Sequence, residues 1–446
     1  MKVLWLSSTN TLFCEKGDRA YNGKGWIASL QDAVTEFCPD IELAVAFLTG
    51  GDPGVVRQDG VTYFKIRKQS PKGLRKLLNN WTGGHIENYD SQIREIAGSF
   101  SPDLIHIFGC ESKLASAVLS VPEIPSVIHI QGILSEAERL FFPPGMTSLD
   151  FISARTLFNE AILRNGSLHL REDYAMRAVL ERRYLGALKY AMGRTDWDRQ
   201  TLQKYSGARY FHVEEAMRPE FYAAAGKYAG RKSGDGTDVQ YGGSHDADGR
   251  RQIRLLSTIS EVPYKGMDMI LRTAHLLAAE GYDVRWAVAG VSSGSDTVRI
   301  FERWTGIRAW DCGVRLCGVL GAAELVREMM SADIYVHPSY CENSSNSICE
   351  AQMVGIPVVA TDAGGTSSLI RDNVTGRTVP CGDAAAMASA IRELVSSPAA
   401  MESIGKSGAG AASARHDRAG IAGSLASVYR TILQDAGQKS IKSETP

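Results

Sequence analysis

Residues 332–365 read ADIYVHPSYCENSSNSICEAQMVGIPVVATDAGG. The apolar runs Ile334–Val336 and Pro357–Ala360 predict two buried strands. Between them, residues 344–354 predict a short helix that ends at Gly355, because a glycine with a proline two residues later commonly stops a helix. Two strands joined through a helix run parallel in one sheet. The stretch therefore predicts an α/β domain built on a parallel sheet.

The rest of the second half repeats this alternation. Further strands are expected at 253–257, 284–288 and 314–319, with helices between them. Residues 267–277 carry apolar side chains at helical spacing, which is typical of a helix packed on a sheet. Residues 251–414 are thus predicted to form a doubly wound α/β domain. In such domains ligands bind outside the carboxyl ends of the strands.

The first half carries a second set of apolar runs, separated by segments long enough for helices. The expected elements are strands at 3–6, 41–48, 104–108 and 127–130, a helix at 26–37 and mostly helix from 134 to 190. Residues 226–250 are rich in glycine and aspartate and nearly lack aliphatic side chains, which favours a flexible linker. We therefore expect a first domain over 1–228 and a linker over 229–250.

The composition fits a globular protein with two domains. The chain has 446 residues, of which 44% are hydrophobic and 22% charged. Its 49 basic and 50 acidic residues leave a formal charge of −1, which argues against nucleic acid as the main partner. The eight cysteines lack zinc-ligand spacing and are interpreted as buried thiols in a reducing cytoplasm.

Neither a signal peptide nor a membrane span is predicted. The first apolar run, Val3–Leu6, is shorter than the ~7 residues of a signal-peptide core. No stretch approaches the ~18 consecutive apolar residues of a spanning helix. We therefore expect a cytoplasmic protein, with association at the inner face of a membrane left open.

Polar or glycine-rich loops follow four strands predicted in the second half. They are SEVPYKG (260–266), GVSSG (290–294), PSYCENSSNSICE (338–350) and TDAGGTSS (361–368). Because the carboxyl ends of parallel strands meet at one edge of a sheet, these loops should lie together. Lys265 supplies a positive charge there, and the helices that the turns open supply backbone N–H groups. This edge is predicted to bind a diphosphate.

The third loop and its helix carry two glutamates, Glu342 and Glu350, eight residues apart. In a fully helical span their carboxylates would lie ~12 Å apart. That exceeds the ~5–5.5 Å of a retaining glycosidase and the ~6.5–9.5 Å of an inverting one. We interpret them as contacts to two parts of one extended ligand. For an isolated pair of this spacing, solvated surface charge is the alternative.

Taken together, these residues resemble family 4 of the retaining glycosyltransferases, which have the GT-B fold. The motifs that carry the resemblance are Lys265-Gly266, Ala289-Gly290, CGVL (317–320), ADIYVHPS (332–339), the E-x7-E pattern, IPVVATDAGG (356–365) and TGRTVPCGD (375–383). The first half is similar more loosely, through the Gly23 and Gly25 loop, DLIHIFG (103–109) and SVIHIQG (126–132).

The resemblance implies two Rossmann-like, doubly wound domains that face a central cleft. The first would bind the acceptor and include a C-terminal crossover helix at 415–435, whereas the second would bind a nucleotide-sugar donor. Residues 436–446 would be a polar tail. In the donor site, Lys265 would contact the diphosphate, Glu342 would lie beside the transferred sugar, and Glu350 would bind the ribose hydroxyls.

The same resemblance implies roles for backbone groups and a mechanism. Amides of Ser344, Ser345 and Asn346 would approach the sugar and phosphate, and Gly290 would belong to the same donor site. The nucleotide-diphosphate sugar would be the donor substrate, with no metal or other cofactor required. The acceptor would attack on the leaving-group side, and a phosphate oxygen would take its proton.

The sequence departs from the family pattern at two places. Thr258 stands where the family usually has an arginine before the lysine. Gln131 stands where many members have a histidine, with His129 two residues earlier on the same predicted strand face. Which of the two faces the reaction centre is open at this stage. The Gly23 and Gly25 loop would approach the acceptor or the donor phosphate, or it would simply start a helix.

Three weaker signals have competing interpretations. Asp196-Trp197-Asp198 matches a metal-binding DxD string, although Thr195 with Asp198 reads better as a helix cap. His337 is interpreted as a packing residue rather than a base. Between 65 and 81 a basic stretch is either a solvated helix face or a patch that docks on anionic lipid. Its residues are Lys65, Arg67, Lys68, Lys72, Arg75 and Lys76, beside Leu74, Leu77, Leu78 and Trp81.

The leading hypothesis is a retaining, metal-independent glycosyltransferase in bacterial polysaccharide or glycoconjugate biosynthesis. Its acceptor would be a glycan, a lipid-linked molecule or a small molecule. The alternatives are a GT-B sugar epimerase or phosphorylase, and a catalytically degenerate protein that binds a sugar nucleotide.

Overall fold

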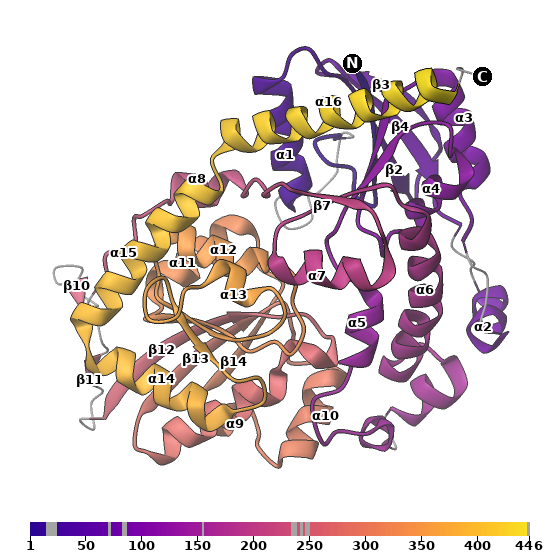
Figure 1. The fold of residues 1–446 in the computed structure, drawn as a ribbon. Helices are drawn as coiled ribbons and strands as arrows, with labels where there is room; N and C mark the ends of the chain where they lie inside the picture. The colour runs from indigo at the N-terminus through magenta and orange to yellow at the C-terminus, as the bar shows by residue number, and fades with distance from the viewer. Residues whose placement is uncertain are drawn as a thin grey trace. The chain divides into compact units, whose positions relative to one another are not determined.

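The computed structural model describes residues 1–14, 25–69, 73–82, 87–153, 156–232, 239–240, 244–245 and 250–443. The chain divides into two compact units, each built on a mainly parallel sheet with helices on its faces (Figure 1). Unit 1 comprises Met1–Glu138, Glu172–Ala216 and His416–Pro446. Unit 2 comprises Arg139–Arg171 and Met217–Arg415.

This division differs from the expected boundaries. Residues 139–171 and 217–228 pack with unit 2, although the sequence placed both in the first domain. The expected linker over 229–250 contains short paired strands, Arg231–Lys232 with Val239–Gln240, and its other residues lie largely outside the described ranges.

Unit 1 holds an eight-stranded sheet of order β3-β4-β2-β1-β5-β6-β7-β8. Every neighbouring pair is parallel except β3 with β4, which form a hairpin. The strands are β1 (Lys2–Ser7), β2 (Glu42–Thr49), β3 (Gly54–Gln58), β4 (Val61–Arg67), β5 (Leu104–Phe108), β6 (Ser126–His129), β7 (Tyr190–Gly193) and β8 (Arg209–His212).

Helices cover both faces of this sheet. The helices of unit 1 are α1 (Gly25–Phe37), α2 (Gly73–Thr82), α3 (Asp90–Phe100), α4 (Ala117–Ser120), α5 (Leu134–Arg139), α6 (Ser167–Ala187), α7 (Asp196–Tyr205) and α16 (Arg418–Ser443). The first strand shows why two faces are needed. Val3 and Trp5 join the core on the α1 and α16 side, whereas Leu4 and Leu6 join the core on the α3 side. Alternate side chains of a strand point to opposite faces, so a strand buried on both faces is apolar throughout.

The C-terminal helix α16 belongs to unit 1, as the crossover-helix expectation required. Figure 1 shows it in yellow above α1, and Leu425 and Tyr429 contribute to the same core as β1. The Tyr429 hydroxyl accepts a hydrogen bond from Trp5 Nε1 at 3.0 Å. The helix continues to Ser443, beyond the predicted end at 435, so the segment expected as a polar tail begins as helix.

Unit 2 holds a seven-stranded sheet in which β14-β13-β12-β15-β16-β17 run parallel and β11 pairs antiparallel with β12. The strands are β11 (Ser244–His245), β12 (Arg251–Thr258), β13 (Asp283–Ala289), β14 (Val314–Gly318), β15 (Ile334–His337), β16 (Val358–Thr361) and β17 (Arg377–Val379). The chain order reverses at β12, which makes the sheet doubly wound as predicted.

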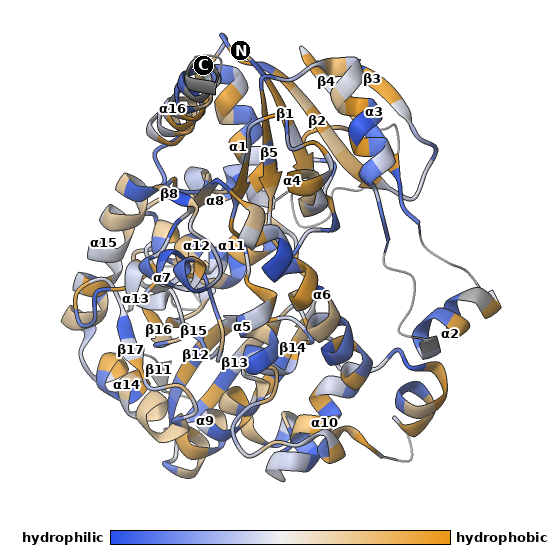
Figure 2. Ribbon diagram, turned by 45° about the vertical axis from the view of Figure 1, so that its right-hand side comes forward, coloured by the Kyte–Doolittle hydropathy of each residue, from blue (hydrophilic) through white to orange (hydrophobic). Residues whose placement is uncertain are grey.

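The helices of unit 2 are α8 (Pro219–Ala223), α9 (Met267–Ala279), α10 (Asp296–Thr305), α11 (Ala322–Ser331), α12 (Asn346–Val354), α13 (Thr366–Leu369), α14 (Ala384–Ser396) and α15 (Pro398–Arg415). Alternation again divides the core between two faces. Ile334 and Val336 pack with α9 and α14, and Tyr335 packs with α11 and α12. In Figure 2 the strands β1, β2 and β5 of unit 1 are coloured largely as hydrophobic, as expected for strands that helices cover on both faces.

All eight cysteines are free thiols: five are buried as predicted, Cys317 is half-buried, and Cys14 and Cys381 are exposed. Among the described residues, none of the helices combines the length and apolarity that crossing a bilayer demands.

Candidate active site

Two glycines let the loops at the carboxyl edge of the unit 2 sheet approach each other closely. Gly266 has φ +82°, and a Cβ atom there would lie 2.1 Å from the Pro338 carbonyl oxygen. Gly290 has φ +95°, and its Cβ would lie 1.9 Å from the Ile259 carbonyl oxygen. Neither separation is sterically allowed, so only glycine fits at these positions. The KG and AG motifs thus bring together the loops that follow β12, β13 and β15.

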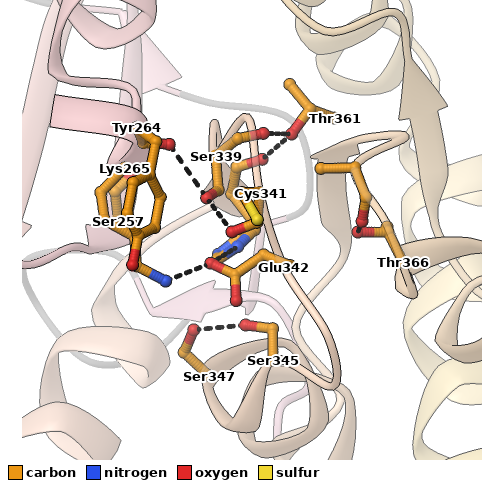
Figure 3. Close-up of polar contacts among 12 residues, drawn as sticks. Ser257, Tyr264, Lys265, Ser339, Cys341, Glu342, Ser345, Ser347, Thr361 and Thr366 are labelled. Atoms are coloured by element: carbon orange, nitrogen blue, oxygen red, sulfur yellow. Dashed lines mark hydrogen bonds and ion pairs between the residues drawn. The ribbon is translucent and has the colours of Figure 1, made fainter. Parts of the chain in front are cut away.

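Lys265 and Glu342 meet at this edge (Figure 3). Lys265 Nζ donates to Glu342 Oε1 at 2.5 Å, and His337 Nε2 lies 3.1 Å from the same oxygen. Lys265 ends the short 3-10 turn Pro263–Lys265, and His337 is the last residue of β15. The Glu342 side chain is 10% exposed and that of Lys265 is 24% exposed. Loops that the sequence predicted to be neighbours therefore supply a shared, partly buried charge cluster.

The cluster keeps Glu342 ionised. Burial alone would raise the pKa of this carboxyl, but the Lys265 charge and the His337 hydrogen bond outweigh burial and hold the pKa well below its usual range. Glu342 is consequently an anion at neutral pH. A carboxylate with so low a pKa cannot donate a proton to a leaving group. It can instead stabilise a positive charge and accept hydrogen bonds.

Backbone hydrogen bonds fix the loop that carries Glu342. The Tyr340 N–H donates to the Tyr264 carbonyl at 2.8 Å, and the Gly365 N–H donates to the Glu342 carbonyl at 3.1 Å. The Thr361 hydroxyl donates to the Ser339 carbonyl (Figure 3). The loops after β12, β15 and β16 are therefore tied to one another, so the carboxylate is held by a rigid support.

Helix α12 begins immediately after this loop. Ser345 is its N-cap residue, and Ser345 Oγ lies 3.0 Å from Ser347 Oγ. Ser344 and Ser345 are buried, and Asn346 is the first helical residue. The start of a helix presents backbone N–H groups and a partial positive charge, which suits an anion. Gly355 ends the helix at φ +98°, as the sequence predicted.

Glu350 lies within α12 and has a cation of its own. Its Oε1 accepts from Arg218 Nε at 2.7 Å and its Oε2 from Arg218 Nη2 at 2.9 Å, with both side chains less than 10% exposed. Because α12 starts only at Asn346, the fully helical span behind the 12 Å estimate does not occur. The two glutamates are nevertheless held by different cations, in keeping with separate tasks.

Of the other residues predicted for the donor site, Thr258 lies at the same edge, Gly25 belongs to unit 1, and Gly23 lies outside the described residues. Thr258 is the last residue of β12, and its side chain lies near the Tyr335 hydroxyl. Gly25 is the first residue of α1, with φ +70° and open space around its Cβ position. A helix therefore starts at this loop, as the interpretation of the loop as a helix start required. Gly23 lies outside the described residues.

His129 and Gln131 belong to unit 1. His129 is fully buried at the end of β6, with ring centroids of Trp26 and His106 at 5.2 and 5.5 Å. Burial holds the pKa of His129 well below its ordinary value. His129 is therefore an aromatic core residue of unit 1, whereas Gln131 follows the strand and is half-buried. Their roles at a reaction centre stay predictions.

The DxD string is a helix start. The Thr195 hydroxyl accepts from the Asp198 N–H at 3.1 Å, and the buried Asp198 carboxylate accepts from the Arg194 N–H at 2.9 Å and the Tyr210 hydroxyl at 2.6 Å. The helix-cap interpretation is confirmed. Within the described ranges, no cluster of three or more His, Cys, Asp or Glu side chains is arranged to hold a metal ion.

Sequence reasoning missed two residues of the site. His337 is buried at the strand end, in keeping with its interpretation as a packing residue, and it also contacts Glu342; its place five residues before that glutamate was the available signal. Arg218 lies 132 residues before Glu350, and no motif links the two. A hollow of about 680 Å³ lies elsewhere in unit 2, toward the amino ends of β12 and β13, and includes Gln252, Arg285 and Trp310. It is remote from the strand-end loops and shares no residue with the candidate site.

Comparison with known proteins finds a likeness within the second half of the chain. Residues 250–397 match the family model described as glycosyl transferases group 1. A D-inositol 3-phosphate glycosyltransferase of Mycobacterium sp. (strain KMS) is 38% identical over 152 residues, which cover 31% of this chain and 31% of that protein. A phosphatidyl-myo-inositol mannosyltransferase of Mycobacterium leprae (strain TN) is 31% identical over 131 residues, covering 29% and 35%. The chain thus spans about a third of the length of these relatives.

Solved structures extend the likeness to both units. Sucrose-phosphate synthase from Thermosynechococcus elongatus superposes with a TM-score of 0.67 at 15% identity, covering 97% of this chain and 99% of that one. Anabaena Alr3699/HepE, solved with UDP and glucose, gives a TM-score of 0.58 at 15% identity and covers 97% and 100%. At such identities the likeness concerns the fold. The chain therefore has the GT-B fold, and its residues 250–397 are similar to glycosyl transferases group 1.

Proposed function

We propose that this chain is a retaining, metal-independent glycosyltransferase of family 4, which binds a nucleotide-diphosphate sugar at the carboxyl edge of the unit 2 sheet. The observation that most supports the proposal is the Lys265–Glu342 pair, at 2.5 Å, inside the segment that matches glycosyl transferases group 1. A cation and an anion set side by side suit a donor whose diphosphate is negative and whose sugar becomes positive during transfer.

Lys265 is assigned to the diphosphate. An ammonium group has three N–H donors, of which one goes to Glu342, so two are available for phosphate oxygens. The start of α12 adds backbone N–H groups of Ser344, Ser345 and Asn346. Thr258 supplies no charge where the family usually has an arginine, so Lys265 carries a larger share of the neutralisation.

Glu342 is assigned to the transferred sugar. As the bond from the anomeric carbon to the phosphate oxygen breaks, positive charge develops on the sugar, and the ionised carboxylate stabilises it. The acceptor oxygen forms its bond to the anomeric carbon on the face that the nucleotide leaves. Its proton goes to a phosphate oxygen of the departing nucleotide, so configuration is retained without a protein nucleophile. The protein contributes positioning and charge.

Acceptor binding is assigned to unit 1. Two relatives are named for acceptors that contain inositol, one of them a lipid. We infer for this chain a glycan, lipid-linked or small-molecule acceptor in polysaccharide or glycoconjugate biosynthesis, used in the cytoplasm.

A lipid-linked acceptor is favoured by the surface of α2. Leu74, Leu78 and Trp81 are 74%, 56% and 53% exposed, and their spacing places them on one face of the helix. Arg67, Lys68 and Lys76 are exposed nearby in sequence. Apolar side chains beside cations suit an anionic lipid surface. Binding to phosphatidylglycerol vesicles should be lost in R67E/K68E/K76E and kept in K406E, whereas equal binding by both would remove this assignment.

A panel of nucleotide sugars tests the main proposal. Each sugar nucleotide is scored for thermal stabilisation of the protein and for slow hydrolysis, and the anomer first released is read by NMR. Stabilisation with release of the retained anomer is the expected result. Stabilisation without turnover would indicate a binding protein, and conversion of the sugar without an acceptor would indicate an epimerase. Release of the inverted anomer would overturn the retaining mechanism.

A further inference from the structure

Arg218 holds the carboxylate that the proposed function assigns to the donor ribose. We propose that Arg218 is a positioning residue for Glu350: it fixes the carboxylate so that the oxygen lone pairs it leaves free accept the ribose hydroxyls. Selectivity for ribose over deoxyribose would then depend on Arg218. This inference rests on the proposed function and names a residue that no motif of the sequence marks.

The geometry is that of a two-point clamp. Arg218 Nε and Nη2 reach the two carboxylate oxygens at 2.7 and 2.9 Å. Two parallel N–H···O bonds fix both the position and the plane of the carboxylate, which a single contact would not do. The guanidinium is itself held, since it lies 4.8 Å from the ring centroid of Phe221 and Pro219 begins α8 directly after it.

The clamp leaves hydrogen-bond acceptor capacity for a diol. An ionised carboxylate can accept about four hydrogen bonds, and Arg218 uses two of them. The remaining lone pairs project away from the guanidinium, on the outer side of each oxygen. Two neighbouring hydroxyls, such as those of a ribose, match two acceptor oxygens of one carboxylate.

Arg218 also opposes the effect of burial. The pKa of Glu350 is raised overall, chiefly by burial and further by the nearby Glu220, and the Arg218 hydrogen bonds and charge oppose this shift. Burial is the main cause that raises the pKa of Tyr335. The charge of the nearby Glu350 raises the pKa of Tyr335 further. Arg218 is the cation that favours the ionised form of Glu350, and an ionised acceptor binds hydroxyl donors more strongly.

Helix α12 does not depend on Arg218 for its place. Arg415 reaches Gln352 Oε1 at 3.2 Å and the Leu369 carbonyl at 3.0 Å. The Gly226 and Tyr228 N–H groups donate to carbonyls at the end of α12, at 2.8 and 3.0 Å. A variant of Arg218 should therefore keep the helix and release only the carboxylate.

The test compares nucleotides that differ in one hydroxyl. UDP, GDP and ADP are first ranked by calorimetry on the wild-type protein, and the tightest is then compared with its 2′-deoxy form. The measured quantity is the ratio of the two dissociation constants. The variants are E350Q, R218M, R218K and R218M/E350Q. R415M is the matched control, because it removes a partly buried arginine of α15 that contacts α12 without touching Glu350.

We expect the wild type and R415M to prefer the ribonucleotide by about fivefold or more. E350Q, R218M and the double variant should share a ratio near one, and R218K should recover part of the preference. A purely structural role of Arg218 would weaken both nucleotides equally and leave the ratio unchanged, which would overturn the inference.

Failure of the proposed function looks different. A wild type that binds none of the three nucleotides, or an E350Q variant that keeps the full ribose preference, would remove the donor site and the inference together. If E350Q lost the preference for the ribonucleotide while R218M kept the wild-type ratio, the role of Arg218 would be refuted and the donor site would stand.

Discussion

Lys265 Nζ and His337 Nε2 approach the same carboxylate oxygen of Glu342, at 2.5 and 3.1 Å. Two donors converging on one oxygen fix the carboxylate in the loop after β15 and keep it ionised. The Lys265–Glu342 pair links the loop after β12 to that after β15, in addition to the backbone hydrogen bond between Tyr340 and Tyr264. Removing either partner should thus affect chemistry and stability to different degrees.

The first prediction separates these two effects. K265M leaves Glu342 buried without its main cation, so it should lower the free energy of unfolding by about 1–3 kcal/mol and turnover by about 100-fold or more. E342Q removes a buried charge and leaves Lys265, which is partly exposed, so turnover should fall similarly with a smaller loss of stability. Urea denaturation and a donor hydrolysis assay measure both.

The exposed pair Lys406–Glu402, also 2.5 Å apart, is the matched control. K406M and E402Q should change neither stability nor turnover appreciably, because exposed ion pairs contribute at most about 1 kcal/mol. Turnover near the wild-type rate in purified K265M or E342Q would contradict the site assignment.

A second prediction concerns the close approach of the strand-end loops. G266A and G290A would place a methyl group about 2 Å from a carbonyl oxygen, so the loops must separate. Each should lose about 3 kcal/mol or more of stability, and nucleotide-diphosphate binding with it. Thermal unfolding with and without UDP reports both effects.

Two other glycines isolate the steric part of this effect. Gly281 and Gly306 have φ of +91° and +71° but open space around the Cβ position. G281A and G306A therefore introduce only backbone strain, about 1–2 kcal/mol. Equal losses in all four variants would show that the loops can move apart at no cost.

The DxD string gives a third prediction. Asp198 is fully buried and caps α7, whereas the side chain of Asp196 is 71% exposed. D198A should lower the free energy of unfolding by about 1–3 kcal/mol and D196A by less than about 0.5 kcal/mol. Denaturation with and without Mn²⁺ checks this. A stabilisation by Mn²⁺ that disappears in both variants would favour the metal interpretation instead.

Much of the fold followed from the sequence because apolar runs mark strands that are buried on both faces. The predicted strand at 104–108 coincides with β5, and that at 253–257 lies inside β12. Strand β3 was missed because it is largely exposed and lacks an apolar run. Residues 139–171 were predicted to belong to the first domain, whereas they pack with unit 2. Contacts between segments that are distant in sequence leave no local sequence pattern from which to predict them.

The site was predictable where residues share a sheet edge. In a doubly wound sheet the loops that follow the parallel strands meet at one edge, so Lys265 and Glu342 were expected to lie close together. Arg218 was not predictable, since its contact with Glu350 depends on how the segment from Met217 onward packs against α12. His129 was predicted as a site residue from its position at a strand end; it is fully buried there, and its role at a reaction centre stays a prediction.

The last prediction is a pH dependence that originates in unit 1. Glu111 follows β5, and its carboxyl folds back over Gly109, so that a Cβ there would lie 2.6 Å from Glu111 Oε1. Burial, with the charge of Glu181, raises the pKa of Glu111 to about 7, against the partial opposition of Arg177. The folded protein therefore binds this proton more tightly than the unfolded chain, whose glutamate has an ordinary pKa of 4.5.

A raised pKa in the folded state stabilises the protein below pH 4.5, and this stabilisation is lost as the pH rises through about 7. Between pH 5 and 8 the wild type should lose up to about 3 kcal/mol relative to E111Q, whose side chain cannot ionise. Urea denaturation of both proteins at the two pH values measures the difference. E123Q, at an exposed glutamate of the same unit, should follow the wild type. If E111Q instead lost stability in parallel with the wild type, another group would be responsible, because only the difference between the two proteins isolates this carboxyl.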